Sequence, residues 1–302
     1  MQIWLIYDRA GLAANQWMAD HYVEVGEKHG IPVQIVVAEE LVIGEGSQLP
    51  DVAVFRSWNQ QLHAQLERLG VVCFNPTAVS AIANDKLRTV EWVASLGLPT
   101  LKTAPLVNRS AVEEVGGYPV VVKPTGGHGG VGVELIAGPE DWEPYWKDAQ
   151  LGTFLVQEVA SGYVTAGARD VRVYVVGGRI LAAMERRAQR SDSGDSAGGA
   201  RVARGTGPLR ANYTLGGSAR VYDLDNPGNP EAAEIRAAVE IVVGELEKYG
   251  QLGTIGVDFL FHHGHPVIGE IEDIVGARML YDHTDIDIVE EFMRAFVLSM
   301  GV

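Results

Sequence analysis

The feature that most constrains the fold is a pair of strand-like segments near the C-terminal end, IGVDFLFHHGHPVIGEIE over residues 255–272. Residues 255–261 and 266–272 each alternate in the manner of a strand, and the His-His-Gly-His run between them predicts a tight turn. Folding the two strands about Gly264 places Asp258 opposite Glu270, with Glu272 on the same face. We therefore predict an antiparallel hairpin that gathers three carboxylates.

Three carboxylates this close together would repel one another, and one of them would normally hold a proton. A hard cation such as Mg²⁺ removes the conflict, because it prefers carboxylate and phosphate oxygens as ligands. The hairpin thus predicts a metal site made of Asp258, Glu270 and Glu272. The alternative that the hairpin alone leaves open is the polar outer face of an ordinary β-hairpin.

Composition narrows the class of protein. The chain has 302 residues, of which 47% are hydrophobic, and this is enough for two or three packed lobes. The formal net charge of -15 argues against a nucleic-acid partner, which needs Lys and Arg to neutralise phosphates. The single cysteine, Cys73, excludes a disulfide within the chain and fits a reducing, cytoplasmic compartment. We expect neither a signal peptide nor a membrane-spanning segment.

The order of segments predicts an α/β protein with α+β lobes. Strands and helices alternate over residues 1–83, which is typical of βαβ units and a parallel sheet. Residues 84–160 predict a helix over 84–96, followed by strands around a glycine-rich loop. Residues 161–302 predict a hairpin turning at Gly177-Gly178, a helix over 230–249, the carboxylate hairpin and a terminal helix over 286–300. Residues 191–208 are rich in Ser, Gly and Ala, and they predict a mobile surface loop.

The glycine-rich loop holds five glycines, namely Gly126, Gly127, Gly129, Gly130 and Gly132. It is not a Walker A loop, because no Lys-Ser or Lys-Thr pair follows, and it is not a Rossmann turn, because a strand follows instead of a helix. Such a loop can lie over phosphates with its backbone N–H groups accessible, and Lys123 adds a positive charge. A flexible hairpin turn with an exposed lysine is the alternative interpretation.

A second lysine, Lys86, follows Asn84 and Asp85 at the start of the predicted helix. Its position in the helix alone predicts a solvated side chain behind an N-terminal cap.

Taken in order, these segments resemble the ATP-grasp superfamily and, within it, the RimK-like glutamate ligases. The resemblance covers essentially the whole chain, and the order and spacing of its motifs carry it. The matching residues are Asn84-Asp85-Lys86, Gly97-Leu98-Pro99, residues 118–132, residues 154–158, Asp170-Val171-Arg172, Glu185-Arg186, Asn212 with Gly216-Gly217, Gly256-Val257-Asp258, and Glu270-Ile271-Glu272 with Gly276.

The resemblance implies an ATP-grasp fold and a role for each matching residue. It implies an N-terminal domain over 1–83, a central lobe over 84–160 and a C-terminal lobe over 161–302, with ATP clamped between the two lobes. The residues implied to bind ATP are Lys86 and Lys123 at the phosphates, the flap with Gly126, Gly127, Gly129 and Gly130, the segment Gln157, Glu158, Val159 and Ala160 at the adenine, and Asp170 at the ribose. Two Mg²⁺ ions, with Mn²⁺ as a substitute, are implied at Asp258, Glu270 and Glu272. Arg172, Arg186 and Asn212 are implied as catalytic residues.

The implied reaction joins a carboxylate to an amine. A substrate carboxylate attacks the γ-phosphate of ATP to give an acylphosphate and ADP, and an amine then displaces phosphate. The implied partners are small-molecule or peptide substrates, with glutamate as the usual amino acid of the family, and a homo-oligomer is open.

Two positions depart from the family pattern. Glu272 stands where the family usually has Asn, and residues 273–279 replace a loop of Ser-Pro-Gly type. An ATP-grasp phosphotransferase and an ATP-binding protein with altered catalysis therefore remain as alternatives.

Other polar residues give weaker indications of a functional role. Arg56 and Asn59 follow a predicted strand, and they lie either near the acceptor or in a capped turn. The arginines of the surface loop and its start, Arg187, Arg190, Arg201 and Arg204, are a candidate cover for an acidic substrate, and Arg210 is a weaker catalytic candidate. Three histidines in one turn, His262, His263 and His265, are more typical of a solvent-facing turn than of a metal site.

Overall fold

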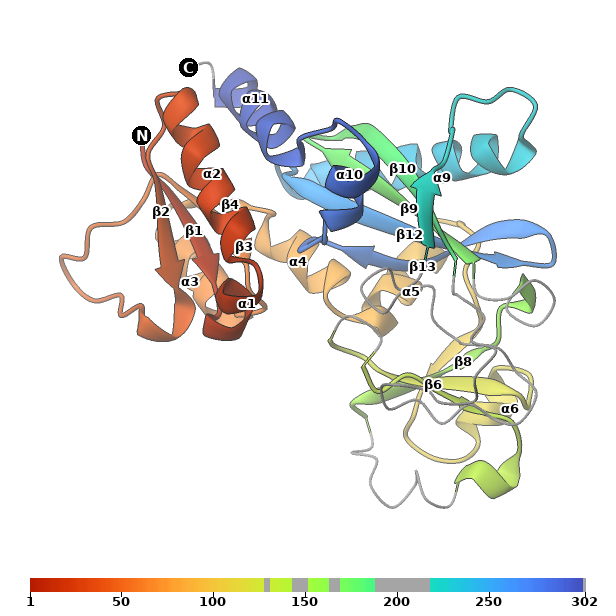
Figure 1. The fold of residues 1–302 in the computed structure, drawn as a ribbon. Coiled ribbons are helices and arrows are strands. Elements are labelled where there is room, and N and C mark those ends of the chain that lie inside the picture. Colours follow the sequence, from red (N-terminus) through yellow and green to blue (C-terminus); the bar gives the residue numbers. More distant parts are fainter. Residues whose placement is uncertain (128–130, 143–151, 163–168, 188–217, 301–302) are drawn as a thin grey trace.

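The structure is a computed structural model that describes residues 1–127, 131–142, 152–162, 169–187 and 218–300. Three sheets form three parts of the molecule (Figure 1). The N-terminal sheet is parallel with the order β2-β1-β3-β4, and its strands are β1 (Ile3–Tyr7), β2 (Val33–Val37), β3 (Val52–Arg56) and β4 (Val72–Phe74). Around it lie α1 (Arg9–Ala14), α2 (Gln16–Lys28), the short helix η1 (Ala38–Glu40) and α3 (Gln60–Arg68). The βαβ prediction is confirmed.

The central sheet is antiparallel and has the order β5-β8-β6-β7. Its strands are β5 (Thr103–Pro105), β6 (Val120–Pro124), β7 (Glu134–Ile136) and β8 (Phe154–Glu158), with α6 (Ala111–Glu114) and η2 (Pro139–Asp141) beside them. Val120, Val122, Val156 and Trp142 form part of a small core under this sheet. β6 and β7 flank the glycine-rich loop, as predicted.

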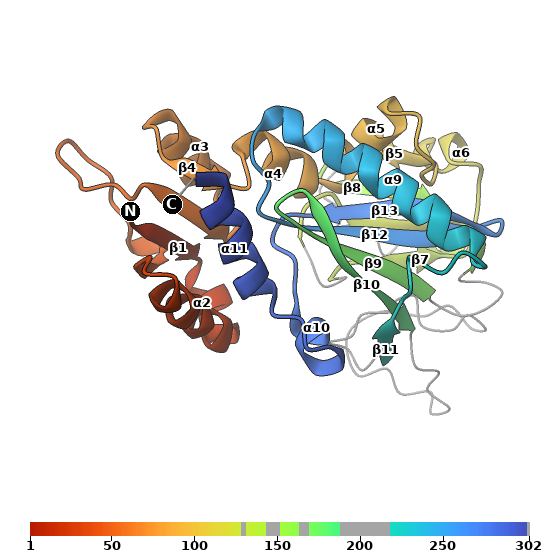
Figure 2. The same ribbon diagram turned by 90° about the horizontal axis from the view of Figure 1, so that it is seen from above.

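The C-terminal sheet is antiparallel and has the order β11-β10-β9-β12-β13. Its strands are β9 (Arg169–Val176), β10 (Arg179–Arg187), β11 (Ser218–Val221), β12 (Thr254–His262) and β13 (His265–Glu272). The helix α9 (Pro230–Leu246), continued by η4 (Glu247–Tyr249), covers one face of the sheet (Figure 2). Because side chains alternate, Val171, Val173 and Val175 pack in the α9 core, while Arg172 and Asp170 point to the opposite face.

Two helices that precede the central sheet pack against the C-terminal sheet. These are α4 (Thr77–Ala83) and α5 (Lys86–Ser95), and their residues Val79, Ala83 and Val93 share a core with α9. Each of the ranges 1–83, 84–160 and 161–302 holds one sheet, and the domain boundaries themselves remain predictions.

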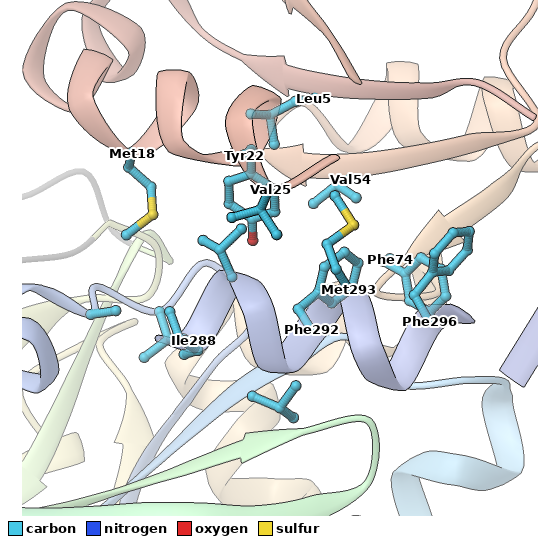
Figure 3. Close-up of a cluster of buried hydrophobic side chains, with 14 of the residues drawn as sticks. Leu5, Met18, Tyr22, Val25, Val54, Phe74, Ile288, Phe292, Met293 and Phe296 are labelled. Carbon is cyan, nitrogen blue, oxygen red and sulfur yellow. The ribbon is translucent and has the colours of Figure 1, made fainter. Parts of the chain in front are cut away.

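The end of the chain returns to the N-terminal domain. After α10 (Arg278–His283), the helix α11 (Ile288–Met300) lies against α2 and the parallel sheet, where Phe292 and Met293 pack with Tyr22 and Val25 (Figure 3). Phe74 and Phe292 make an edge-to-face contact with ring centroids 5.5 Å apart. The same core includes residues of β9 and β10, so α11 fixes the N-terminal domain to the C-terminal sheet. Among the described residues, no helix is both long enough and apolar enough to cross a bilayer.

Candidate active site

The register of the β12–β13 hairpin sets the position of the three carboxylates. Asp258 pairs with Glu270, as predicted. The turn is not centred on Gly264, however, as a simple hairpin with this pairing would require. The turn has two residues, His263 and Gly264, with φ of 51° and 84°, so that His262 pairs with His265. An irregularity between Asp258 and Phe259 leaves Gly269 as an extra residue in β13, and this β-bulge brings Glu270 opposite Asp258.

The predicted metal ligands lie together on the face of the sheet that α9 does not cover. Ligand oxygens of Asp258, Glu270 and Glu272 all lie within 4.8 Å of one another. Three convergent carboxylates are the donor set that a hard divalent cation prefers. These three residues therefore fit Mg²⁺, and they would hold it on the face of the sheet that α9 leaves uncovered.

Two buried arginines complete the site. Arg172 donates from Nε and Nη2 to the two carboxylate oxygens of Asp258, over 2.7 Å and 2.6 Å. Arg186 donates from Nη2 to Asp258 Oδ2 over 2.6 Å. Burial opposes the charge on Asp258, but the two guanidinium groups lower its pKa to about 2. The catalytic candidates Arg172 and Arg186 thus face the predicted metal ligands directly.

Asp170 has a protein partner that the motifs did not indicate. It pairs across the β9–β10 register with Arg186, whose Nε donates to Asp170 Oδ1 over 2.5 Å. Burial raises the pKa of Asp170 to about 6, although Arg186 acts in the opposite sense. This carboxylate is engaged in orienting Arg186, and its contact with a ribose remains a prediction.

Glu272, which carries a charge that the family's usual Asn lacks, also has a cationic partner. Arg172 Nη2 lies 2.8 Å from Glu272 Oε1, so the same guanidinium bridges Asp258 and Glu272. Burial raises the pKa of Glu272 to about 7, partly opposed by Arg172. The departure from the family's Asn is therefore compensated by a charged neighbour and does not leave an isolated third anion.

Lys86 connects the carboxylates to the glycine-rich loop. It is the first residue of α5, behind the cap Asp85, whose side chain accepts from Leu87 N and Arg88 N. Its Nζ lies 2.9 Å from Glu270 Oε1 and donates to the Gly127 carbonyl over 2.5 Å, and its backbone N–H donates to the Thr125 carbonyl. Lys86 is buried, so the reading as a solvated residue behind a cap is wrong.

Lys123 lies on β6 at the start of the same loop. Burial lowers its pKa to about 8, partly opposed by the attraction of Glu270, while Lys86 adds to the lowering. A cation placed between a carboxylate site and a glycine loop suits a phosphate, which would restore its positive charge.

Nucleotide binding should therefore depend on pH through Lys123. In the free protein the Lys123 ammonium loses its proton as the pH rises through about 8, so the affinity for ADP is expected to fall by about tenfold above that value. Calorimetric titrations between neutral and alkaline pH measure this change. Lys123→Arg keeps its charge over the same range and should show a flatter profile, and equal slopes for both proteins would contradict the assignment.

The predicted adenine segment lies at the end of β8. β8 lies between β5 and β6, and its backbone is paired with those strands as far as Glu158. Gln157 Nε2 donates to Thr103 Oγ1 over 2.8 Å, and the Glu158 carboxylate accepts from Lys102 N over 2.7 Å. Ala160 is buried in a small cluster with Leu101 and Val267. Ala160 thus contacts β13 of the C-terminal sheet through Val267, and the role of this segment at the adenine remains a prediction.

Several candidates lie outside the described residues. These are Gly129, Gly130, Asn212, Arg190, Arg201, Arg204 and Arg210, and their roles remain predictions. Gly126 and Gly127 are described, and Gly127 takes a φ of 91°, a region that favours glycine.

Other polar candidates have carboxylate partners. Arg187 pairs with Glu185 at 2.7 Å. Two of the three histidines at the β12–β13 turn pair with different carboxylates, His262 with Glu158 and His265 with Glu234. Among the described residues, the three histidines do not form a metal-binding group.

The structure also adds Trp58 and Asp273, which the motifs did not indicate, and gives Arg56 a partner. Trp58 Nε1 donates to Asn84 Oδ1 over 2.9 Å, and Arg56 Nη2 donates to the Val275 carbonyl. Asp273, next to Glu272 and buried, accepts from Ser80. These contacts tie the N-terminal domain and α4 to the end of β13. Each residue is an ordinary polar side chain in the sequence, and only the fold brings them to this junction.

Comparison with known proteins agrees with this geometry. The RimK-like ATP-grasp domain matches residues 83–296. A probable alpha-L-glutamate ligase of Vibrio atlanticus (strain LGP32) is 26% identical over 300 residues, covering 94% of this chain and 89% of that protein. Another from Teredinibacter turnerae (strain ATCC 39867 / T7901) is 31% identical and covers 90% of this chain and 85% of its own length. The crystal structure of the D-cycloserine synthetase DcsG superposes with a TM-score of 0.72 at 18% identity, covering 99% of this chain and 100% of that chain.

The solved structure supports the fold, and the family match extends over most of the chain and includes all the candidate residues that converge on the C-terminal sheet. The chain therefore belongs to the RimK-like ATP-grasp family of ATP-dependent carboxylate–amine ligases.

Proposed function

We propose that this protein joins an amino acid, through an amide bond, to a small molecule or peptide, by way of an acylphosphate. The observation that carries the proposal is the convergence of Asp258, Glu270 and Glu272 on one face, with Lys86 bridging Glu270 and the glycine-rich loop. Glutamate is proposed as the amino acid, because the curated relatives are named probable alpha-L-glutamate ligases. A cytoplasmic location and a homo-oligomer remain predictions.

In the first step a substrate carboxylate attacks the γ-phosphorus of ATP and ADP leaves. Lys86 and Lys123 would hold the phosphate oxygens, and the carboxylates would hold Mg²⁺, which supplies neutralising charge to those oxygens. Lys123 precedes the glycine-rich loop and Lys86 contacts its Gly127, so a triphosphate at the start of the loop would meet positive charge from both.

In the second step an amine attacks the acyl carbon and phosphate leaves. Negative charge then develops on the tetrahedral oxygen and on the departing phosphate, and a planar guanidinium fork is suited to either. Arg172 and Arg186 would supply it, because both project from the uncovered face beside the carboxylates. Their present hydrogen bonds to Asp258 hold them in a fixed orientation.

The product of turnover tests the proposal. Purified protein with ATP and Mg²⁺ is expected to release ADP and inorganic phosphate only when both a carboxylate and an amine substrate are present, and mass spectrometry should find the amide. A phosphorylated organic product would indicate a phosphotransferase instead. If the protein bound nucleotide in a Mg²⁺-dependent manner but released no ADP with any amino acid or dipeptide, it would be an ATP-binding protein with altered catalysis.

A further inference from the structure

The chain crosses twice between the C-terminal sheet and the central sheet, and both crossings contact the β12–β13 hairpin. The first crossing, over residues 97–102, runs beside β13, where Thr100 forms a parallel bridge with Ile268. Thr100 Oγ1 donates to the Ile268 carbonyl over 3.0 Å, and Ile268 N donates to the Pro99 carbonyl over 3.0 Å. The second crossing begins after β8, and the structure describes it over residues 159–162.

Two hydrogen bonds tie the second crossing to the turn of this hairpin. The Ser161 backbone N–H donates to His262 Nδ1 over 3.2 Å, and Ser161 Oγ accepts from the His263 backbone N–H over 2.6 Å. Gly162 lies so close to β12 that a Cβ at this position would be 2.8 Å from the Phe261 carbonyl oxygen. The backbone of residues 161 and 162 is therefore held against the end of β12.

The imidazole of His262 is oriented from two sides. A ring nitrogen that accepts a hydrogen bond carries no proton, so the proton of neutral His262 is on Nε2. Nε2 lies 3.9 Å from Glu158 Oε2, where the carboxylate attracts it. The other oxygen of Glu158 accepts from Lys102 N over 2.7 Å, which fixes the carboxylate in turn. His262 is thus a placed acceptor for the Ser161 N–H.

Residues 159 and 160 are consequently held at both ends. On one side, β8 pairs with β6 as far as Glu158, and on the other side Ser161 is bound to the turn. Between them, Ala160 packs in the small cluster with Leu101 and Val267. A segment whose geometry is set before its ligand arrives loses less conformational entropy on binding, so the ligand binds more tightly. Residues 157–160 are the segment predicted at the adenine.

We propose that Ser161 and His262 are positioning residues for the adenine of the nucleotide. Through them, the turn of the β12–β13 hairpin holds residues 159 and 160 in the geometry that binds the base. The inference rests on the proposed function and its ATP site. The same hairpin carries the three carboxylates away from its turn, so one pair of strands aligns the nucleotide at both its base and its phosphates.

Direct binding separates the base from the phosphates. Calorimetry with the full chain and Mg²⁺ compares ADP with inorganic tripolyphosphate, which offers phosphate oxygens but has no base. Ser161→Ala and His262→Ala each remove one of the two hydrogen bonds. Their double variant is expected to bind ADP about tenfold more weakly, and each single variant about threefold more weakly. Tripolyphosphate affinity should not change, because Lys86, Lys123 and the carboxylates are intact, and this binding also shows that the variants are folded.

Two further variants at the same turn test the chemistry of the contact. His262→Asn should recover most of the ADP affinity, because its amide oxygen can accept from the Ser161 N–H. His265→Ala is the matched control, since His265 pairs with His262 in the hairpin register but has an exposed side chain that contacts Glu234. It should bind ADP and tripolyphosphate as tightly as the unaltered protein does.

Equal weakening of ADP and tripolyphosphate in the double variant would indicate a general structural effect and overturn the inference. An unchanged ADP affinity, an equal loss in His265→Ala, or a His262→Asn variant no better than His262→Ala would overturn it too. Selective loss of ADP affinity in a protein that makes no amide would sink the ligase proposal alone. Amide formation with an unchanged KM for ATP in the double variant would sink the positioning role alone.

Discussion

Replacing Asp258 with Asn is expected to lower kcat by about a thousandfold, because the loss of one anionic ligand weakens the hold on Mg²⁺ at the transferring phosphoryl group. The same carboxylate balances Arg172 and Arg186, both of which are buried. Removing its charge leaves two guanidinium groups less well paired, so the free energy of unfolding should fall by about 3 kcal/mol. The turnover assay and chemical denaturation measure the two effects separately.

Asp20→Asn provides the control for the substitution, since Asp20 is an exposed residue of α2 far along the chain from the site. It should leave both quantities unchanged. If Asp258→Asn retained Mg²⁺-dependent turnover near the original rate, the β12–β13 hairpin would not be the metal site. If turnover fell but calorimetry showed unaltered Mg²⁺ affinity, Asp258 would act through its arginines alone.

The second large effect is expected for Arg186→Met, which should also lower kcat by about a thousandfold. The guanidinium projects beside Asp170 and Asp258 on the uncovered face, where charge develops during acyl transfer. Arg186→Lys should recover little of the loss, because an ammonium lacks the planar fork that engages two oxygens. Steady-state kinetics at saturating ATP distinguish a lower kcat from weaker nucleotide binding.

The neighbouring residue supplies a matched control for Arg186. Arg187 is the next residue of β10 and therefore points to the opposite face, where it pairs with Glu185. Arg187→Met should reduce activity little, although it carries the same change of charge one position away. Equal losses in both variants would show that the effect comes from overall charge or from β10 itself.

Much of the fold was readable from local patterns. Alternating apolar residues and glycine positions predicted the βαβ domain, the β9–β10 turn at Gly177-Gly178 and the flanking of the glycine loop by β6 and β7. The pairing of Asp258 with Glu270 was also predicted, but through the wrong turn. Local sequence does not reveal that a two-residue turn is offset by a bulge at Gly269, because the two irregularities cancel in the final pairing.

The surroundings of the site were less readable. The motifs implied a ribose contact for Asp170, which stays a prediction, and they did not reveal that Asp170 pairs with Arg186. They also left Lys86 open to a solvated role, whereas it is buried between Glu270 and Gly127. Such partners come from strands and helices distant in the chain, and their identity depends on how the sheets are packed.

By itself, the sequence determined which functional groups the site contains. These are three acidic residues at strand spacing, two lysines beside a glycine-rich loop, and arginines in adjacent strands. Strand alternation and turn chemistry are local properties, so these could be read directly. The tertiary structure alone decided that Arg172 bridges Asp258 and Glu272, and that Lys86 lies between Glu270 and Gly127. Those relations cross between sheets and strand ends, and they exist only once apolar cores such as the one around α11 have fixed the sheets in place.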